Sequence, residues 1–228
     1  TASLWAGRRA VGRCSSAWRS NVVVTTAAAE HDLAFVGQPA HDLEHFLLLG
    51  LDPLVNYGAK LRYKTGGQLG APVAVKTTAG ARGQGVAHSQ CIESWLVGVP
   101  GLKVVAPSTP ADAWGLMHAA LQEDGPVVYV DHKRLFPTAG ELARDAVPVP
   151  IGRAVVRRRG ADVTIATHSY MCRVADSAAD RLAALGVACE IVDLRTLAPL
   201  DVDTAGDRAR SLPSTTTKPC AGRFSSAP

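Results

Sequence analysis

The sequence Ala87-His88-Ser89-Gln90-Cys91 comes after a glycine-rich loop, Gly80-Ala81-Arg82-Gly83-Gln84-Gly85, and before the apolar run Leu102–Ala106. Upstream, residues 71–77 place valines between smaller or polar residues, a pattern that predicts a strand leading into the loop. Glycine lets the backbone approach a ligand closely or adopt dihedrals that other residues avoid. Because ligands of open α/β sheets bind beyond the ends of strands, His88 is a candidate site residue. The alternative is a hydrogen-bonded structural histidine, the commoner role of a lone histidine.

The segments around this loop predict an α/β fold. Helices are expected at residues 53–64, at residues 89–97, and from Ser108-Thr109-Pro110 to the stop at Gly125-Pro126. Leu102–Ala106 and Val127–Val130 are short apolar runs typical of buried parallel strands. Strand, helix and strand in succession make a βαβ unit, whose connection is right-handed in nearly all cases.

A second α/β unit is expected later in the chain. Residues 162–167 and 187–194 predict strands, and residues 170–185 predict the helix between them. Val174, Ala178, Leu182 and Leu185 recur at spacings of three and four, as in a helix that packs on a sheet. The proline-bearing stretch from His132 to Pro150 between the two units is interpreted as a linker.

Composition excludes several classes of protein. The 228 residues are 47% hydrophobic, yet no apolar run is long enough for a membrane helix. Of the formal net charge of +4, residues 1–29 hold four arginines and no acid, and residues 205–228 hold four basic residues against Asp207, so residues 30–204 carry −3. Basic and aromatic residues do not cluster there, which argues against nucleic-acid binding. The five cysteines lack a Cys-x-x-Cys pair, which favours a reducing compartment over a zinc site or disulfide framework.

Common motifs are also absent. The spacing Gly80-x-x-Gly83-x-Gly85 has the wrong order for a dinucleotide fingerprint and lacks the lysine of a phosphate-binding P-loop. No Gly-x-Ser-x-Gly elbow occurs. Arg157-Arg158-Arg159 is interpreted as a solvated strand end rather than a site for an acidic partner.

Several stretches in collinear order carry a family resemblance. They are Lys60-Leu61-Arg62-Tyr63-Lys64-Thr65-Gly66-Gly67, His88-Ser89-Gln90-Cys91, Pro100-Gly101-Leu102-Lys103-Val104-Val105, Pro107-Ser108-Thr109-Pro110-Ala111-Asp112-Ala113-Trp114-Gly115-Leu116 and Asp193-Leu194-Arg195-Thr196-Leu197. Together they resemble the beta subunit of the thiamine-diphosphate-dependent 2-oxo acid dehydrogenases, the decarboxylating component of the pyruvate and branched-chain complexes. The likeness covers about residues 46–204 and includes Val149-Pro150-Ile151-Gly152-Arg153-Ala154 at the domain junction.

The resemblance implies a domain organisation. Residues 46–147 would form a thiamine-diphosphate-binding, transketolase-like pyrimidine-binding domain, a parallel sheet flanked by helices. Residues 148–204 would form a partial transketolase C-terminal-like α/β domain. Residues 1–45 show no convincing amphipathic segment and are expected to be an irregular or atypical N-terminal segment. Residues 205–228, rich in Ser, Thr and Pro, are expected to be a disordered tail.

The resemblance also implies site residues. His88 matches the family's active-site histidine, which implies that it positions the 2-oxo acid and transfers a proton, or assists acyl transfer to the lipoyl arm. Phe46 falls where the family places an aromatic ring against the cofactor pyrimidine, with a core position as the alternative. Some members hold potassium with backbone oxygens at positions that match Val73, Ala120, Leu121, Glu123 and Gly125.

The implied activity is oxidative decarboxylation of a 2-oxo acid, pyruvate or branched-chain, with acyl transfer to lipoamide. The implied assembly is an alpha2beta2 heterotetramer joined to a lipoyl acyltransferase core. Thiamine diphosphate would be shared with the alpha subunit, which holds the diphosphate and magnesium through a Gly-Asp-Gly motif that this chain lacks. His132-Lys133-Arg134-Leu135-Phe136 favours the branched-chain or broad oxo acid group. The expected compartment is the cytoplasm, with the mitochondrial matrix as the alternative suggested by the arginine-rich first 29 residues.

Two departures from the family pattern bear on activity. The family carries, upstream of the Phe46 position, a glutamate that hydrogen-bonds the aminopyrimidine, whereas residues 18–22 read Trp-Arg-Ser-Asn-Val. The family's C-terminal domain also runs on where this chain changes to its Ser/Thr/Pro-rich tail. One interpretation is a catalytically degenerate member or fragment that acts only as an alpha-subunit-binding module, and another is a working paralogue that draws the carboxylate from elsewhere. A transketolase or deoxyxylulose-phosphate synthase is disfavoured, because those enzymes carry both halves of the site in one chain.

Overall fold

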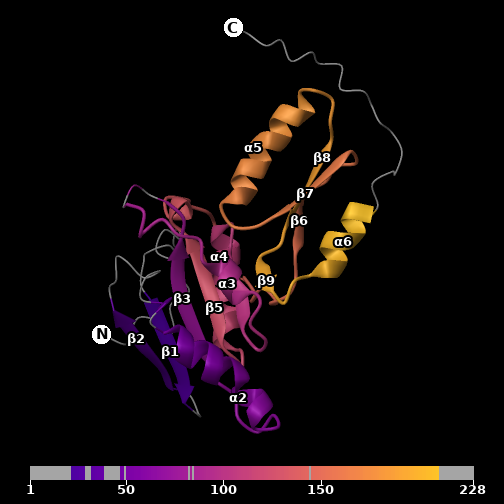
Figure 1. The fold of residues 1–228 in the computed structure, drawn as a ribbon. Helices are drawn as coiled ribbons and strands as arrows, with labels where there is room; N and C mark the ends of the chain where they lie inside the picture. The colour runs from indigo at the N-terminus through magenta and orange to yellow at the C-terminus, as the bar shows by residue number, and fades with distance from the viewer. Residues whose placement is uncertain are drawn as a thin grey trace.

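The computed structural model describes residues 22–28, 32–38, 47–48, 50–81, 83, 85–143 and 145–210. Two β-sheets with flanking helices form an α/β fold, as predicted (Figure 1). Most of the larger sheet comes from the first two-thirds of the chain, and the smaller sheet comes from residues 155–193.

The larger sheet has six strands in the order β2-β1-β3-β5-β4-β9. These are β1 (Val22–Ala28), β2 (Asp32–Gln38), β3 (Val73–Ala79), β4 (Lys103–Val105), β5 (Val127–His132) and β9 (Thr196–Ala198). Strands β3, β5 and β4 are parallel. The hairpin of β1 and β2 adds antiparallel to β3, and β9 adds antiparallel to β4. The carboxyl ends of the three parallel strands therefore share one edge, where α/β proteins place their ligands.

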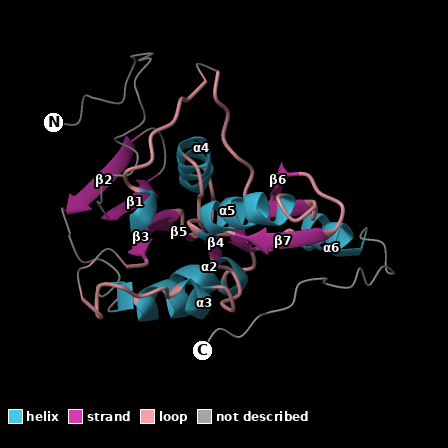
Figure 2. Cartoon of the chain, turned by 90° about the horizontal axis from the view of Figure 1, so that it is seen from above, coloured by secondary structure: helices cyan, strands magenta, loops and turns pink. Residues whose placement is uncertain are grey.

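Helices cover both faces of this sheet. The π-helix η1 (Pro53–Gly58), α2 (Ala59–Lys64) and α3 (Glu93–Leu96) lie on one face, and α4 (Pro110–Leu121) lies on the other (Figure 2). Successive strand residues point to opposite faces. Accordingly Val128 packs in the core with Leu96, and Val127 packs in the core with Leu116. Burial on both sides explains why β4 and β5 are continuous apolar runs in the sequence.

The smaller sheet has the order β6-β8-β7. Its strands are β6 (Val155–Arg158), β7 (Val163–Thr167) and β8 (Cys189–Asp193), and its helices are α5 (Met171–Ala183) and α6 (Val202–Arg210). Helix α5 buries Ala175 and Ala179 against Ile191 of β8. The chain then returns to the larger sheet, because β9 pairs Ala198 with Val104.

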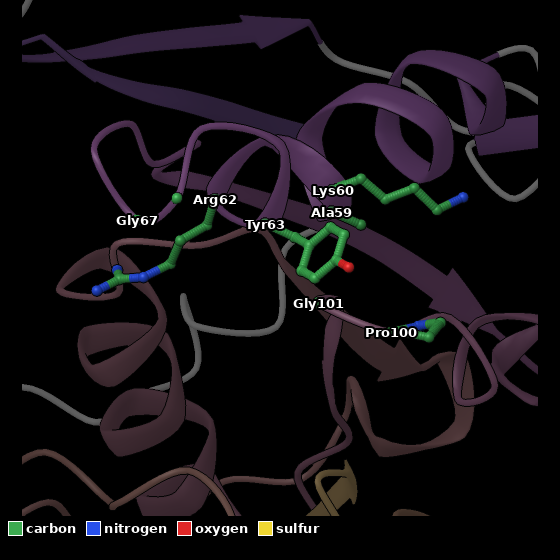
Figure 3. Close-up of a pocket in the computed structure, with 8 residues that line it drawn as sticks. Ala59, Lys60, Arg62, Tyr63, Gly67, Pro100 and Gly101 are labelled. Atoms are coloured by element: carbon green, nitrogen blue, oxygen red, sulfur yellow. The ribbon is translucent and has the colours of Figure 1, made fainter.

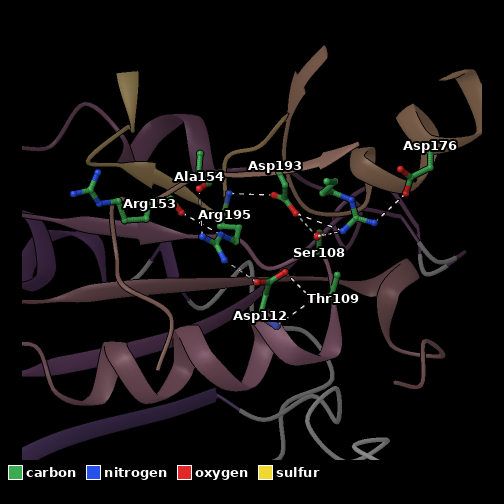
Figure 4. Close-up of polar contacts among 9 residues, drawn as sticks. Ser108, Thr109, Asp112, Arg153, Ala154, Asp176, Asp193 and Arg195 are labelled. Carbon is green, nitrogen blue, oxygen red and sulfur yellow. Dashed lines mark hydrogen bonds and ion pairs between the residues drawn. The ribbon is translucent and has the colours of Figure 1, made fainter. Parts of the chain in front are cut away.

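A polar network joins the two halves of the molecule (Figure 4). Ser108, before α4, donates a hydrogen bond to the fully buried Asp193 carboxylate at the end of β8. Arg157 Nη1 lies 3.1 Å from Ser108 Oγ, and its Nη2 lies 3.0 Å from Asp176 Oδ2. A second link joins Arg195 Nη1 to Asp112 Oδ1 at 3.3 Å. Burial raises the pKa of the Asp193 carboxyl above its usual range.

Most of the predicted elements are confirmed. The helix expected at residues 53–64 is present as η1 followed by α2. The helices within 108–125 and 170–185 and the strands near 102–106, 127–130, 162–167 and 187–194 are present with shifted ends, and the helix expected at 89–97 is reduced to α3.

Four predictions from the sequence are wrong. Residues 1–45 are not irregular throughout, since β1 and β2 lie there. Residues 205–210 are not tail but the end of α6, while residues 211–228 lie outside the described part of the chain. The stretch from His132 to Pro150 is not a linker throughout. His132 is the last residue of β5, and the next three residues form the 3₁₀-helix η2 (Lys133–Leu135). Finally, Arg157 is no solvated strand end, because Asp176 and Ser108 hold its guanidinium.

Candidate active site

The candidate catalytic histidine lies on the loop that follows β3. Gly80 directly after the strand has φ +80°, and its N–H donates to the Gln90 carbonyl at 2.9 Å, which closes the loop at its base. At the tip, Ser89 Oγ donates to the Gly85 carbonyl at 2.6 Å. His88 is half-buried between these two contacts. The structure therefore places His88 at the carboxyl edge of the parallel strands, as the sequence predicts.

Gly80 is required because the ring of His132 occupies the space beside it. A Cβ at Gly80 would lie 2.1 Å from His132 Nε2. His132 Nδ1 accepts a hydrogen bond from the Arg134 N–H at 3.2 Å. Burial, and then the nearby charges of Arg134, His168 and Lys133, lower the pKa of His132 from 6.5 to about 4. His132 is therefore neutral near pH 7, in agreement with its acceptor role.

A buried ion pair lies beneath the loop. Lys76 Nζ on β3 lies 2.8 Å from Asp131 Oδ2 on β5, and the Asp131 side chain is fully buried. Burial raises the pKa of Asp131, and the Lys76 ammonium opposes that rise. The pair joins the parallel strands β3 and β5, whose carboxyl ends form the edge that carries the site.

The smaller domain contributes side chains to the same edge. Tyr170, at the start of α5, stacks on His132 with ring centroids 4.9 Å apart and planes 14° apart. His168 Nε2 lies 4.0 Å from Glu93 Oε1 on α3. Sequence reasoning named His132 only within the stretch that favours the branched-chain or broad oxo acid group, and it missed Tyr170, His168 and Glu93 as site residues. One signal was available. His132 ends the apolar run of β5, and β5 is the neighbour of β3, the strand that leads to His88.

The cofactor-binding candidate Phe46 lies outside the described residues, and so do residues 18–21 and the nearest acidic residues upstream of Phe46, Glu30 and Glu44. The predicted contact of Phe46 with a pyrimidine ring stays a prediction.

The candidate potassium positions lie together at the opposite edge of the sheet. Val73 begins β3, Ala120 and Leu121 end α4, and Glu123 and Gly125 lie in the turn before β5. The register places Ala74 opposite Val127, so the starts of the two strands are neighbours. The Glu123 carboxylate there binds the Lys103 ammonium.

A cavity of about 840 Å³ opens at this same edge (Figure 3), and His88 is not among its lining residues. It lies between α2 and the turn before β4, and Tyr63, Pro100 and Gly101 are among its lining residues. A Cβ at Gly101 would lie 1.9 Å from the Ala59 carbonyl oxygen, so glycine permits the close approach of turn and helix. Because it faces the amino ends of the parallel strands, this cavity is not the expected place for the chemistry.

Within the described part of the chain, no group of three or more His, Cys, Asp and Glu side chains is arranged to hold a metal ion. None of the helices found among the described residues has the length and apolarity needed to cross a bilayer.

Two domain families match the sequence. The family described as transketolase, pyrimidine binding domain, matches residues 34–138, and transketolase, C-terminal domain, matches residues 152–214. A solved structure described as "Split gene transketolase, inactive beta4 tetramer" shares 28% identity with a TM-score of 0.52, covering 61% of this chain and 45% of that chain.

Curated relatives are beta subunits of dehydrogenase components. The beta subunit of acetoin:2,6-dichlorophenolindophenol oxidoreductase from Cupriavidus necator is 42% identical over 160 residues, 70% of this chain and 47% of the relative. The beta-1 subunit of the mitochondrial pyruvate dehydrogenase E1 component from Arabidopsis thaliana is 39% identical over 171 residues, 73% and 47% of the two chains. The 2-oxoisovalerate dehydrogenase subunit beta from Bacillus subtilis is 36% identical over 191 residues, 78% and 58%. The chain thus spans about half the length of the curated relatives it matches.

The chain therefore carries two domains of the transketolase type, a pyrimidine-binding domain followed by a C-terminal domain, and it is similar in sequence to the beta subunits of pyruvate and 2-oxoisovalerate dehydrogenases.

Proposed function

We propose that this chain is the beta subunit of the decarboxylating component of a thiamine-dependent 2-oxo acid dehydrogenase. It supplies the pyrimidine-side half of an active site that an alpha subunit completes. The observation that carries the proposal is the place of His88, on a glycine-rich loop at the carboxyl edge of β3 and β5 within a pyrimidine-binding domain. Relatives named as beta subunits of pyruvate and 2-oxoisovalerate dehydrogenases support it.

The loop surface fits a cofactor that is covered by a second subunit. Gly83 and Gly85 have φ +79° and +93°, and a Cβ on either would have no neighbour within 4 Å among the residues that the structure describes. Val86, two residues before His88, is 92% exposed. The open loop surface leaves room for another molecule at this edge. We expect thiamine diphosphate and the alpha subunit to cover it, with magnesium held on the alpha side.

The chain's own residues orient the reactants. Thiamine diphosphate supplies the carbanion chemistry when it is bound, and the protein provides position and proton transfer. In the proposed mechanism the His88 imidazole orients the 2-oxo acid and carries a proton at a ring nitrogen, first for decarboxylation and then for acyl transfer to a lipoyl group. The hydrogen bond from the Gly80 N–H to the Gln90 carbonyl closes the base of the loop that carries His88.

Potassium is proposed at the opposite edge of the sheet. The last carbonyl groups of a helix have no partner four residues on within that helix, so the end of α4 can offer an oxygen to a cation at Leu121. The Ala120 carbonyl accepts a hydrogen bond from the Glu123 N–H at 3.4 Å and can offer its second lone pair. Val73, Glu123 and Gly125 would complete the set with backbone oxygens. A rise in the melting temperature in KCl that NaCl does not reproduce would support this site, and equal melting temperatures in the two salts would count against it.

The activity is tested by coexpressing the chain with an alpha subunit. The purified complex is assayed for CO₂ release from pyruvate and from 3-methyl-2-oxobutanoate with thiamine diphosphate and magnesium, and for acylation of a lipoyl domain from the acyltransferase core. We expect turnover only when both chains are present, and a loss of about 100-fold or more in His88→Ala. His118→Ala is the matched control, because His118 lies on α4 and stacks on Trp114.

The same experiment distinguishes the enzyme subunit from the second candidate function, a module that only binds the alpha subunit. Stable binding to the alpha subunit without turnover would select the interaction-module interpretation, which the missing glutamate motivates. If the chain neither binds the alpha subunit nor supports turnover, both the enzyme-subunit and the interaction-module proposals are wrong. The ratio of the two decarboxylation rates would assign the substrate group, for which His132-Lys133-Arg134-Leu135-Phe136 predicts the branched-chain or broad oxo acid class.

A further inference from the structure

Three consecutive residues, the last of β5 and the two that follow it, reach the loop that carries His88. The His132 ring fills the space beside Gly80, and Arg134 Nε donates to the Ala81 carbonyl at 3.3 Å. Between them, Lys133 Nζ donates a hydrogen bond to the backbone carbonyl of His88. The segment His132–Arg134 therefore contacts both the start of the loop and the histidine itself.

Lys133 is the unusual member of this segment. Its residue is only 3% exposed, whereas lysine is almost never fully buried unless it is paired. Burying an ammonium group is costly unless hydrogen bonds replace its hydration. A charged donor also makes a stronger hydrogen bond to a carbonyl than a neutral donor does. The contact thus fixes the peptide group of His88 and, with it, the direction in which the imidazole leaves the backbone.

The smaller domain supports the same segment from the other side. Tyr170 stacks on His132, and the Arg134 guanidinium lies 5.4 Å from the centre of the Tyr170 ring. An aromatic ring attracts a guanidinium over its face. Lys133 therefore stands between two residues that are held from α5, so its backbone position is fixed independently of the loop it binds.

We propose that Lys133 is a positioning residue for His88, acting through the hydrogen bond from its ammonium to the His88 carbonyl and held in place by Tyr170. This inference rests on the proposed function of His88. Lys133 does not touch the reacting atoms. It restricts the imidazole to the orientation in which proton transfer occurs, so its loss affects turnover more than substrate affinity.

The test uses the complete alpha–beta assembly with Lys133→Met, which keeps the apolar stem and removes the donor. We expect kcat to fall about ten- to a hundredfold, with a much smaller change in KM. Lys133→Arg retains a cationic donor and is expected to recover most of kcat. Lys64→Met is the matched control, because Lys64 is an exposed lysine on α2 near the Tyr57 ring.

A double-mutant cycle distinguishes a positioning role of Lys133 from a general effect on the fold. His88→Ala leaves the backbone carbonyl in place, so Lys133 keeps its contact while the imidazole is gone. If Lys133 acts through that imidazole, Lys133→Met causes no further loss in the His88→Ala background. An equal loss in both backgrounds would overturn the proposal.

Hydrogen exchange over residues 80–91 provides a readout that does not depend on activity. We expect faster exchange in Lys133→Met and near-normal exchange in Lys133→Arg, and unchanged exchange in Lys133→Met would overturn the proposal. If the assembly with His88 and Lys133 intact shows no turnover, the proposed function is wrong. The hydrogen-exchange measurement still tests whether Lys133 holds the loop. Should Lys133→Met not fold, Lys133→Gln takes its place in both measurements.

Discussion

Lys76 Nζ on β3 lies 2.8 Å from Asp131 Oδ2 on β5, and the pair is buried where the two strands reach the candidate active site. Removing one partner of a buried pair leaves an uncompensated charge, which costs about 3–5 kcal/mol. We therefore expect Lys76→Met and Asp131→Asn each to lower the free energy of unfolding by about that amount. The double variant should be more stable than the sum of the two losses predicts. Urea unfolding of the four proteins measures this, and strictly additive losses would contradict it.

The neutral state of His132 predicts acid sensitivity. The pKa of His132 is about 4 in the folded protein against 6.5 for an unperturbed histidine, so the unfolded chain binds a proton first as the pH falls. The stability contributed by this group is present above pH 6.5 and is lost as the pH falls toward 4. Allowing for its partial exposure, the loss is on the order of 1–2 kcal/mol.

His132→Phe tests this prediction while keeping the stack on Tyr170. Unfolding is measured at pH 7, 5.5 and 4.5 for both proteins. The difference in stability between them should change with pH by about 1–2 kcal/mol in favour of the variant at low pH. A difference that is constant across these pH values would show that His132 does not titrate as described.

Gly80→Ala is expected to destabilise the protein and displace the loop. The new Cβ would meet His132 Nε2 at 2.1 Å, and the backbone has φ +80°. Gly66→Ala is the control, since Gly66 has φ +61° and a Cβ there meets nothing within 4 Å. The control should lose about 1–2 kcal/mol from backbone strain alone, and Gly80→Ala should lose clearly more. Equal losses in thermal unfolding would show that contact with His132 has no effect.

Thr109 caps helix α4. Its Oγ1 accepts a hydrogen bond from the Asp112 N–H at 3.1 Å, and Pro110 follows at the first helical position. Thr109→Ala should lower the free energy of unfolding by about 1 kcal/mol, whereas Thr109→Ser, which keeps the oxygen, should stay close to wild type. A similar loss in both variants by urea unfolding would assign the effect to the lost methyl group.

The parts of the fold that local residues specify were predictable. Helix α4 begins at the Thr109 cap and ends at Leu121, shortly before the predicted stop at Gly125-Pro126, and β4 and β5 are apolar runs between turn residues. What was missed depends on residues far apart in the chain. Arg157 looks solvated in the sequence because Ser108, the partner that holds it from the other half, is 49 positions away. Likewise β9 has only three residues, and only its pairing with β4 makes it a strand.

The candidate site shows the same division. The glycine-rich loop and the strand before it place His88 at a sheet edge, and the structure agrees. Lys133 was not predictable as a site residue, because it binds a backbone carbonyl 45 positions away. Because every residue has a backbone carbonyl, the sequence gives no signal of which residue accepts such a hydrogen bond. The stack of Tyr170 on His132 depends equally on how the two domains meet.

The return of β9 to the larger sheet has a consequence for biosynthesis. Val104 cannot find its antiparallel neighbour until Ala198 has left the ribosome. Until then the nascent pyrimidine-binding domain presents the open edge of β4, and unpaired strand edges are sites of misassembly during synthesis. Pairings between such distant residues also slow folding, because a long loop must close before the contact forms. We therefore expect chaperones that bind nascent chains to retain this protein until translation has passed β9.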